Sequence, residues 1–212
     1  MTRFLSNLSP SIIKWPDQAG KNIIEQNFRE KGFPGIIGAI DGCHIKIDKP
    51  SNDPDSYINR KGFYSIQMHA VCDHRRKIID LFVGYPDSGY PLQKYVLTPY
   101  RDRGNLNRYQ NNFNVKLSQN RYVIEHCFGI LKQKFRQLYH VKLRDIPLIV
   151  HFIRAACVLH NIALDDEFVV DIDPSSIPNN PALPATADND DYDNDDDDDD
   201  AVGIRDRIAH LL

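Results

Sequence analysis

The sequence predicts an α/β fold in which a small antiparallel sheet is followed by two long helices. Three segments, residues 37–47, 63–72 and 76–84, are rich in Ile, Val, Phe and Tyr and are joined by short connections, which is typical of a strand meander. Two later segments, residues 118–138 and 146–164, are long and apolar enough to predict helices that cover the sheet.

The N-terminal residues predict one helix, over residues 17–31. Ile23, Ile24 and Phe28 form an apolar stripe on it, and Gly32 follows its last turn as a helix stop. We interpret residues 1–32 as an N-terminal helical remnant that precedes the main domain.

The first predicted strand contains a carboxylate in apolar surroundings. Asp41 lies in the string GAIDGCHIKI, between Ile40 and a further pair of β-branched residues, and an ionised group there is costly unless a cation or hydrogen-bond donors meet it. Residues 52–62 after it are rich in turn formers and predict a loop, and residues 73–75 predict the turn between the second and third strands.

The helix over residues 118–138 carries a second carboxylate beside its buried face. Arg121, Glu125 and Lys132 form a polar stripe that adjoins the apolar stripe, and from there Glu125 could reach the sheet. The alternative is a simple ion pair between Glu125 and Arg121, one turn apart, worth a few tenths of a kcal/mol.

The helix over residues 146–164 is apolar almost all round and is predicted to be a core helix. Asp145 suits its N-cap and Pro147 its first turn. Its histidines, His151 and His160, are expected to be structural rather than ligands.

Charge is distributed very unevenly along the chain. The first 164 residues hold 24 Lys+Arg and 13 Asp+Glu, a net charge of +11, whereas residues 165–200 hold 15 acids and no Lys or Arg. The sequence therefore predicts a basic domain over residues 33–164, an acidic disordered tail over residues 165–200, and a short amphipathic segment over residues 201–212. The basic domain favours a polyanionic partner.

Four cysteines stand far apart in apolar contexts, and each has a histidine within three positions. Their spacing does not follow a zinc finger, so we interpret them as reduced buried thiols, with zinc as the less favoured alternative. We find no apolar run of about 20 residues in the sequence and expect no membrane partner.

A third carboxylate, Asp87, lies in the string DSGYPL. With Asp41 and Glu125 it makes three carboxylates in apolar surroundings, on two strand-like segments and one helix. Oxygen ligands of this kind suit a hard divalent cation such as Mg²⁺ or Mn²⁺.

Six strings spread over residues 15–163 resemble the PIF/Harbinger transposases and the nucleases derived from them, in the order that this family shows. They are WP, GFPGIIGAIDGCHI, YINRKGFYSIQMHAVCD, DSGYPLQKYVLTPY, the segment from Arg121 to Phe135, and AACVLHNIA. The resemblance implies a ribonuclease-H-like fold of the DDE transposase/integrase type, a metal-binding catalytic triad of Asp41, Asp87 and Glu125, Mg²⁺ or Mn²⁺, and cleavage of DNA. It also implies a nuclear location and a Myb/SANT-like DNA-binding companion protein.

The chain departs from this family between Pro86 and Asp87. There the family has a helix and a further strand, whereas VGYP runs directly into DSGY here, so the domain is predicted to be shortened. The lost strand should lie beside the Asp41 strand, so Asp87 would begin about 10 Å, two strand spacings, from its place. Carboxylates that share a metal must each come within about 2 to 2.6 Å of it.

Three functions are compatible with the sequence. The first is a metal-dependent nuclease of transposase origin, and the second is a catalytically inactive derivative that binds DNA or nuclear proteins. The third is an interaction protein whose acidic tail mimics nucleic acid. Possible DNA phosphate contacts are Lys46, Arg60, Lys61, Arg121 and Lys132.

Overall fold

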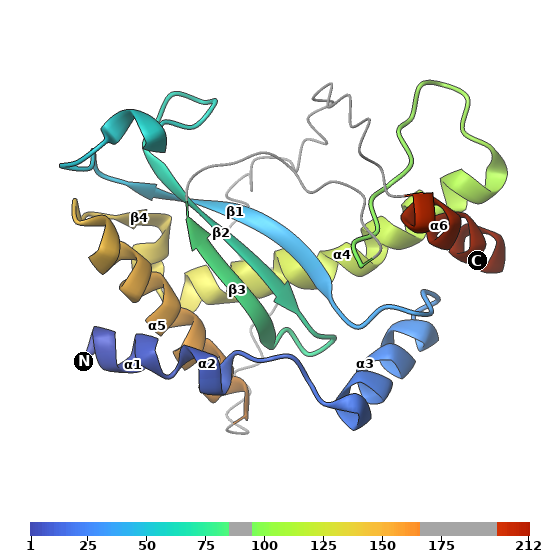
Figure 1. The fold of residues 1–212 in the computed structure, drawn as a ribbon, viewed down its shortest axis with the longest axis horizontal. Coiled ribbons are helices and arrows are strands. Elements are labelled where there is room, and N and C mark those ends of the chain that lie inside the picture. Colours follow the sequence, from blue (N-terminus) through green and yellow to red (C-terminus); the bar gives the residue numbers. More distant parts are fainter. Residues whose placement is uncertain (85–94, 166–198) are drawn as a thin grey trace. The chain divides into compact units, whose positions relative to one another are not determined.

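The computed structural model describes residues 1–84, 95–165 and 199–212, and their contacts divide the chain into two units. Unit 1 comprises the described residues within 1–87 and 120–171, and unit 2 those within 88–119 and 172–212 (Figure 1). Asp87 and the acidic stretch from 166 to 198 lie outside the described residues, so the predicted disorder of the tail stays a prediction. The predicted domain boundaries also stay predictions.

Unit 1 is built on a four-stranded mixed sheet in the order β3-β2-β1-β4. Strands β1 (Ala39–Ile47), β2 (Ser65–Cys72) and β3 (Ile78–Gly84) form the predicted antiparallel meander. The fourth strand, β4 (His140–Val141), is short and runs parallel to β1, pairing only with Lys46 and Ile47. The mixed α/β class predicted from the sequence is confirmed.

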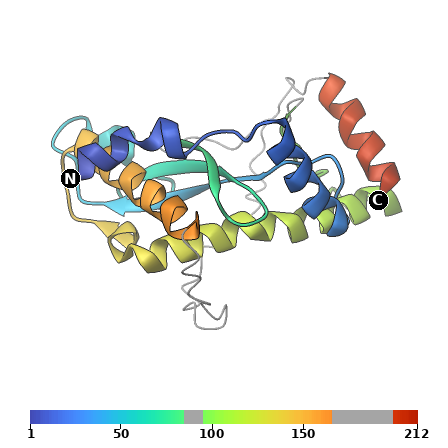
Figure 2. The same ribbon diagram turned by 90° about the horizontal axis from the view of Figure 1, so that it is seen from below.

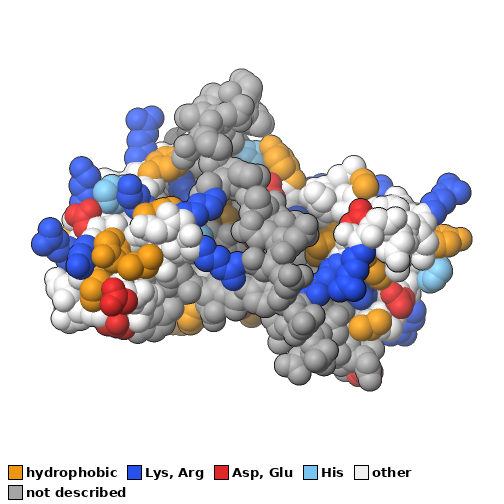
Figure 3. All heavy atoms as spheres, turned by 90° about the horizontal axis from the view of Figure 1, so that it is seen from above, with side chains coloured by type: hydrophobic (Ala, Val, Ile, Leu, Met, Phe, Trp, Pro, Cys, Tyr) orange, Lys and Arg blue, Asp and Glu red, His pale blue; other side chains and the backbone are white. Residues whose placement is uncertain are grey.

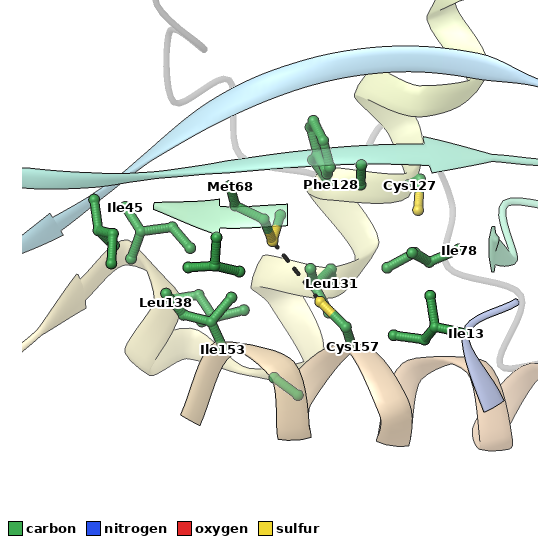
Figure 4. Packing of buried hydrophobic residues seen from close by; sticks show 14 of the residues in the cluster. Ile13, Ile45, Met68, Ile78, Cys127, Phe128, Leu131, Leu138, Ile153 and Cys157 are labelled. Atoms are coloured by element: carbon green, nitrogen blue, oxygen red, sulfur yellow. Dashed lines mark hydrogen bonds between the residues drawn. The ribbon is translucent and has the colours of Figure 1, made fainter. Parts of the chain in front are cut away.

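The core of unit 1 lies between one face of this sheet and two helices. Ile45, Met68 and Ile78 point from the three long strands toward Leu131 of α4 (Arg108–Lys134) and Cys157 of α5 (Ile146–Asp165) (Figure 4). All five side chains are fully buried or nearly so. These residues fix the sheet against the second half of α4, which is the half that carries Glu125.

Helix α5 is a core helix, as predicted. The Asp145 carboxylate accepts a hydrogen bond from the Leu148 N–H at 2.7 Å, which confirms the predicted N-cap. By length and composition alone α5 could also cross a membrane, contrary to our expectation that no run approaches that length. Its residues from 149 to 161 nevertheless supply much of the buried core of unit 1.

The end of α5 also secures the outer edge of the sheet. Asn161 donates from Nδ2 to the Ile78 carbonyl at 2.7 Å, and its Oδ1 accepts from the Ile78 N–H at 2.9 Å. Beside it, His160 Nε2 lies 3.0 Å from the Arg76 carbonyl oxygen. The string HN in AACVLHNIA therefore has a structural role, because no described strand pairs with β3 on this side and Asn161 takes up the hydrogen bonds of Ile78 instead.

The N-terminal residues contain two short helices that were not predicted. Helices α1 (Thr2–Asn7) and α2 (Ser9–Ile12) lie alongside α5 (Figure 2). Helix α3 (Gln18–Glu30) confirms the predicted helix, with Asp17 as its N-cap and Gly32 in the left-handed conformation after it. A 3₁₀ turn, Pro54–Tyr57, interrupts the predicted loop over residues 52–62.

Helix α4 differs from its prediction at both ends. It begins ten residues earlier than expected, because Asn107 and Gln110 exchange side-chain to backbone hydrogen bonds of 2.9 and 3.0 Å in a capping box. It ends at Lys134 rather than Leu138, and a 3₁₀ turn, Arg136–Tyr139, carries Leu138 into the core. Apolar periodicity alone missed the polar first turns and did not separate the 3₁₀ turn from the helix.

Unit 2 joins the first half of α4 to the C-terminal helix α6 (Asp199–Leu211). Tyr100 lies between them: its ring meets Phe113 edge to face, Arg205 stacks over it at 4.3 Å, and its hydroxyl donates to Asp206 at 2.6 Å. The predicted short C-terminal helix is therefore confirmed, and Tyr100 contacts it through Arg205 and Asp206.

Candidate metal centre

Asp41 lies on the face of β1 that is turned toward the core. Its partner on the neighbouring strand β2 is Ala70, which is buried. Asp41 points to the same face of β1 as Cys43 and Ile45. The Oδ1 atom accepts a hydrogen bond from the Gly42 N–H at 2.9 Å. Burial raises the pKa of Asp41, and the Arg121 guanidinium and the Gly42 N–H act in the opposite direction.

Glu125 lies on the same half of α4 as Arg121, one turn further on. The Arg121 Nη2 atom is 3.4 Å from Glu125 Oε1, and both side chains are partly exposed. The ion pair that we considered as the alternative role of Glu125 is therefore present. Since the same guanidinium also acts on Asp41, Arg121 links the two carboxylates.

The third predicted ligand, Asp87, lies outside the described residues. The described part of the chain does not bring three His, Cys, Asp or Glu side chains together in a group that could hold a metal. Two of the three predicted carboxylates, Asp41 and Glu125, thus lie on β1 and α4, and the charge of Arg121 acts on both. The assembly of the triad stays a prediction.

The edge of β1 that faces β4 lies beside this centre. Within the described residues, strand β4 pairs with β1 only at its C-terminal end, so no described strand pairs with residues 39–45 on that side. Lys132 reaches this edge from α4, where its Nζ donates to the His44 carbonyl at 3.4 Å. The edge beside Asp41 is where the strand predicted to be missing would lie.

The five predicted phosphate contacts are divided between two places. Arg121 and Lys132 lie on α4 beside Asp41 and His44. Lys61 acts on His44 from the turn before β2, next to Arg60, and Lys46 follows His44 on the same face of β1. Figure 3 shows Lys and Arg side chains gathered around the hydrophobic residues in its left part, with few Asp or Glu side chains among them.

Two residues that support the sheet beside the site were not singled out from the sequence. Asn59 is buried and accepts hydrogen bonds from the N–H groups of Lys61 and Phe63, which shapes the turn that presents Lys61. Asn161 holds β3, as described above. Their signal in the sequence is an Asn within a string shared with the family, which by itself does not separate a structural role from a chemical one.

The region that contains the candidate site also matches a known protein family. Residues 40–86 and 87–161, which together make up more than half of the chain, match the DDE superfamily endonuclease family. The chain belongs to that family. The DDE match thus includes all three predicted triad positions, and its two segments meet between Pro86 and Asp87, where the sequence lacks the expected helix and strand.

Three relatives illustrate how far the DDE likeness extends. The chain is 28% identical over 207 residues to "Putative nuclease HARBI1" of Bos taurus, covering 78% of this chain and 59% of that protein. The Homo sapiens protein of the same name is 28% identical over 200 residues, with 78% and 57% covered. "Protein ALP1-like" of Arabidopsis thaliana is 23% identical over 215 residues, with 78% and 52% covered. No solved structure matches the chain.

The chain spans between 52% and 59% of the length of these relatives. The match to the cattle protein extends over 207 positions, but 78% of the 212 residues here is only about 165. About 40 aligned positions (207 less 165) therefore have no residue of this chain. Together these positions are at least as many as a helix and a strand require.

Proposed function

We propose that this chain is a DDE-type nuclease that cleaves phosphodiester bonds of DNA with a divalent cation, Mg²⁺ or Mn²⁺. The observation that carries the proposal is the partly buried Asp41, whose pKa is raised by burial and which shares a cation with Glu125 on the facing helix. A carboxyl group held in this way has a need for positive charge that a metal would meet.

The residues present fit such a metal. Asp41 and Glu125 offer the oxygen donors that hard cations prefer, and Asp87 is the proposed third ligand. When bound, the cation would supply Lewis-acid activation of the attacking oxygen and stabilisation of the leaving oxygen. Arg121 now provides positive charge at this place, so it would have to turn away from the carboxylates.

The basic residues around the site have a separate role in the proposal. Arg121 and Lys132 are placed to hold DNA phosphates beside Asp41, and Lys61 would extend the same contact across the sheet edge. The sheet order, with three antiparallel strands and a fourth strand parallel to β1, supports a ribonuclease-H-like fold that has been shortened. DNA is accordingly the proposed partner, and the nucleus the proposed location.

A second candidate is an inactive derivative that binds DNA or a nuclear protein such as a Myb/SANT-like companion. It is favoured by the division of the family match at Pro86 and by the open edge of β1 at residues 39–45. Among the described residues no strand pairs with β1 beside Asp41, which is where the family's strand would deliver Asp87. This candidate differs from the first only in catalysis, so a cleavage assay separates them.

The test is cleavage of supercoiled plasmid DNA by the full chain with Mg²⁺ or Mn²⁺, compared with the variants Asp41→Asn and Glu125→Gln. We expect slow nicking that requires the metal and is lost in both variants. Asp80→Asn, an exposed carboxylate of β3, is the matched control and should nick like the unmodified chain. Nicking that persists in Asp41→Asn would overturn the assignment, and no nicking by any protein would favour the inactive derivative.

A further inference from the structure

The sheet of unit 1 has a second face, turned away from the core, that neither Asp41 nor Glu125 uses. We call it the outer face and define it by two rows across the three long strands. The first row is Gly42, His69 and Phe82, and the second is His44, Gln67 and Gly84. Successive strand residues point to opposite faces, so these six lie opposite Asp41, Met68 and Val83 of the core face.

Phe82 lies open on this face in an unusual way. Its side chain is 60% exposed, although it stands in the middle of a strand. A Cβ atom at Gly84 would be 2.6 Å from Cε1 and Cζ of the Phe82 ring, so the ring lies along the strand over the glycine. His69 flanks it on β2, with a ring centroid 6.2 Å away. The absence of a side chain at Gly84 thus leaves a flat aromatic surface toward solvent.

Polar groups surround this aromatic surface. A Cβ at Gly42 would be 2.8 Å from Gln67 Nε2 and 3.2 Å from His69 Nδ1, so both side chains gather over that glycine. His44 Nδ1 lies 3.0 Å from the buried Ser65 Oγ, which also accepts from Asn59 Nδ2 at 3.0 Å. These contacts fix the direction of the His44 ring.

The charges on the outer face are mostly positive at the end that carries His44. Lys46 follows His44 on this face, and Lys61 and Lys132 both act on its ring. Asp80, two residues before Phe82, places a carboxylate at the opposite end. An anionic ligand would therefore lie with its charge toward Lys46 and Lys61 and its apolar part on Phe82.

We propose that the outer face binds single-stranded DNA, with an unpaired base stacked on Phe82 and the adjacent phosphates near Lys46 and Lys61. Every base offers an aromatic surface for such stacking, and the partly exposed ring of Phe82 is the surface that would receive it. Paired bases in a duplex cannot reach the ring. The proposal rests on the proposed function only for the choice of DNA.

The test is fluorescence anisotropy of a labelled twelve-nucleotide oligothymidylate with the full chain in EDTA, where metal-dependent cleavage cannot occur. Phe82→Ala should weaken binding about 10-fold, since a stacked base contributes on the order of 1 to 3 kcal/mol. Phe82→Trp should retain binding. Phe4→Ala is the matched control, because Phe4 on α1 is 66% exposed and lies on another part of unit 1, and it should bind like the unmodified chain.

A second variant tests the stacking surface without removing the Phe82 ring. Gly84→Ala places a Cβ against the Phe82 ring, and should weaken binding although every aromatic residue is retained. Binding of a matched duplex should be unchanged in both variants. Equal affinity of Phe82→Ala and Phe4→Ala for the single strand would overturn the proposal. Asp41→Asn should bind the single strand normally, so loss of cleavage and loss of stacking are separate results.

Discussion

Arg121 acts on both described carboxylates of the candidate metal centre: it forms an ion pair with Glu125, and its charge opposes the rise that burial causes in the pKa of Asp41. Removing its charge should make the centre more attractive to a divalent cation. We predict that Arg121→Gln tightens Mn²⁺ binding about 10-fold, or about 1.4 kcal/mol, because two unit charges about 4 Å apart in water repel each other by about 1 kcal/mol and Mn²⁺ carries two charges. Isothermal titration calorimetry measures this affinity directly.

Another ion pair of the same spacing provides the control. Arg29 and Glu25 lie one turn apart on α3 and pair at 2.7 Å, and Arg29→Gln should leave Mn²⁺ affinity unchanged. If Arg121→Gln also left it unchanged, or weakened it, Arg121 would not be competing with the metal.

The buried position of Asp41 predicts a dependence of stability on pH. Burial raises its pKa above the usual 3.8, so the folded protein binds this proton more tightly than the unfolded chain. The contribution of Asp41 to stability is therefore favourable at low pH and is lost as pH rises from about 3.8 through the raised value. Above that window the buried charge is a net cost.

We therefore predict that Asp41→Asn melts at a higher temperature than the unmodified chain at pH 7 without metal, by an amount on the order of 2 °C. The difference should shrink toward pH 4, where Asp41 takes up its own proton. Thermal unfolding of Asp80→Asn in parallel controls for a general effect of removing a carboxylate. A lower melting temperature for Asp41→Asn at pH 7 would show that the hydrogen bond from Gly42 and the charge of Arg121 outweigh burial.

At the residue scale the sequence was informative where one side chain conflicts with its surroundings. Asp41 in a segment rich in Ile already indicated a site, because an uncompensated charge there is costly. The effect of the Arg121 charge on Asp41 could not be predicted, since it depends on how α4 lies against β1. For Glu125, helical spacing suggested the ion pair with Arg121 but not its relation to Asp41.

At the scale of elements, the contact between α5 and β3 replaces a neighbouring strand. Asn161 makes two hydrogen bonds to Ile78, which is fully buried. Asn161→Ala should destabilise the protein by about 2 kcal/mol, because two buried backbone groups lose their partner. Urea denaturation monitored by circular dichroism measures the change.

The same substitution at an exposed position is the control for that experiment. Asn27 on α3 bonds only to the Ile23 carbonyl within its own helix, and Asn27→Ala should change stability by less than about 0.5 kcal/mol. Equal effects at the two positions would mean that β3 does not need Asn161 at its edge.

Strands β1, β2 and β3 and helices α3 and α5 were predictable because local signals agreed with tertiary packing. β-branched runs, a short turn at residues 73–75 and the cap at Asp145 all indicate the structure that forms. The start of α4 was missed because its first turns carry no apolar stripe. Strand β4 was missed because two residues are too few for a pattern, and it forms only beside β1.

At the scale of the whole molecule, the acidic segment and DNA should compete for the same basic residues. The first 164 residues carry a net charge of +11, and residues 165–200 carry 15 acids. Replacing the acids between 166 and 198 by Asn, with the length unchanged, should tighten binding of duplex DNA. With six phosphate contacts, the slope of log K against log salt should be about −5.

A salt titration of DNA binding by both proteins measures these effects together. A chain in which the Asp residues are replaced by Glu retains the charge and should behave like the unmodified protein. Equal affinity of the charged and neutral forms would mean that the acidic segment does not meet the DNA surface. A slope near zero would remove DNA as the partner.

The central prediction is that this chain has a DDE centre at Asp41 and Glu125 that is incomplete at Asp87. The most direct test inserts a helix and strand of the family's kind between Pro86 and Asp87 and compares plasmid cleavage with Mg²⁺ and Mn²⁺ before and after insertion. A displacement of about 1 Å can cost a catalytic group about 100-fold in rate, and the displacement expected for Asp87 is larger, so we expect the unmodified chain to be a poor nuclease. The inserted chain should cleave much faster, and Asp41→Asn should abolish that gain. Equal, Asp41-dependent cleavage by the unmodified chain would contradict the account, because Asp87 would then have reached the centre without the missing strand.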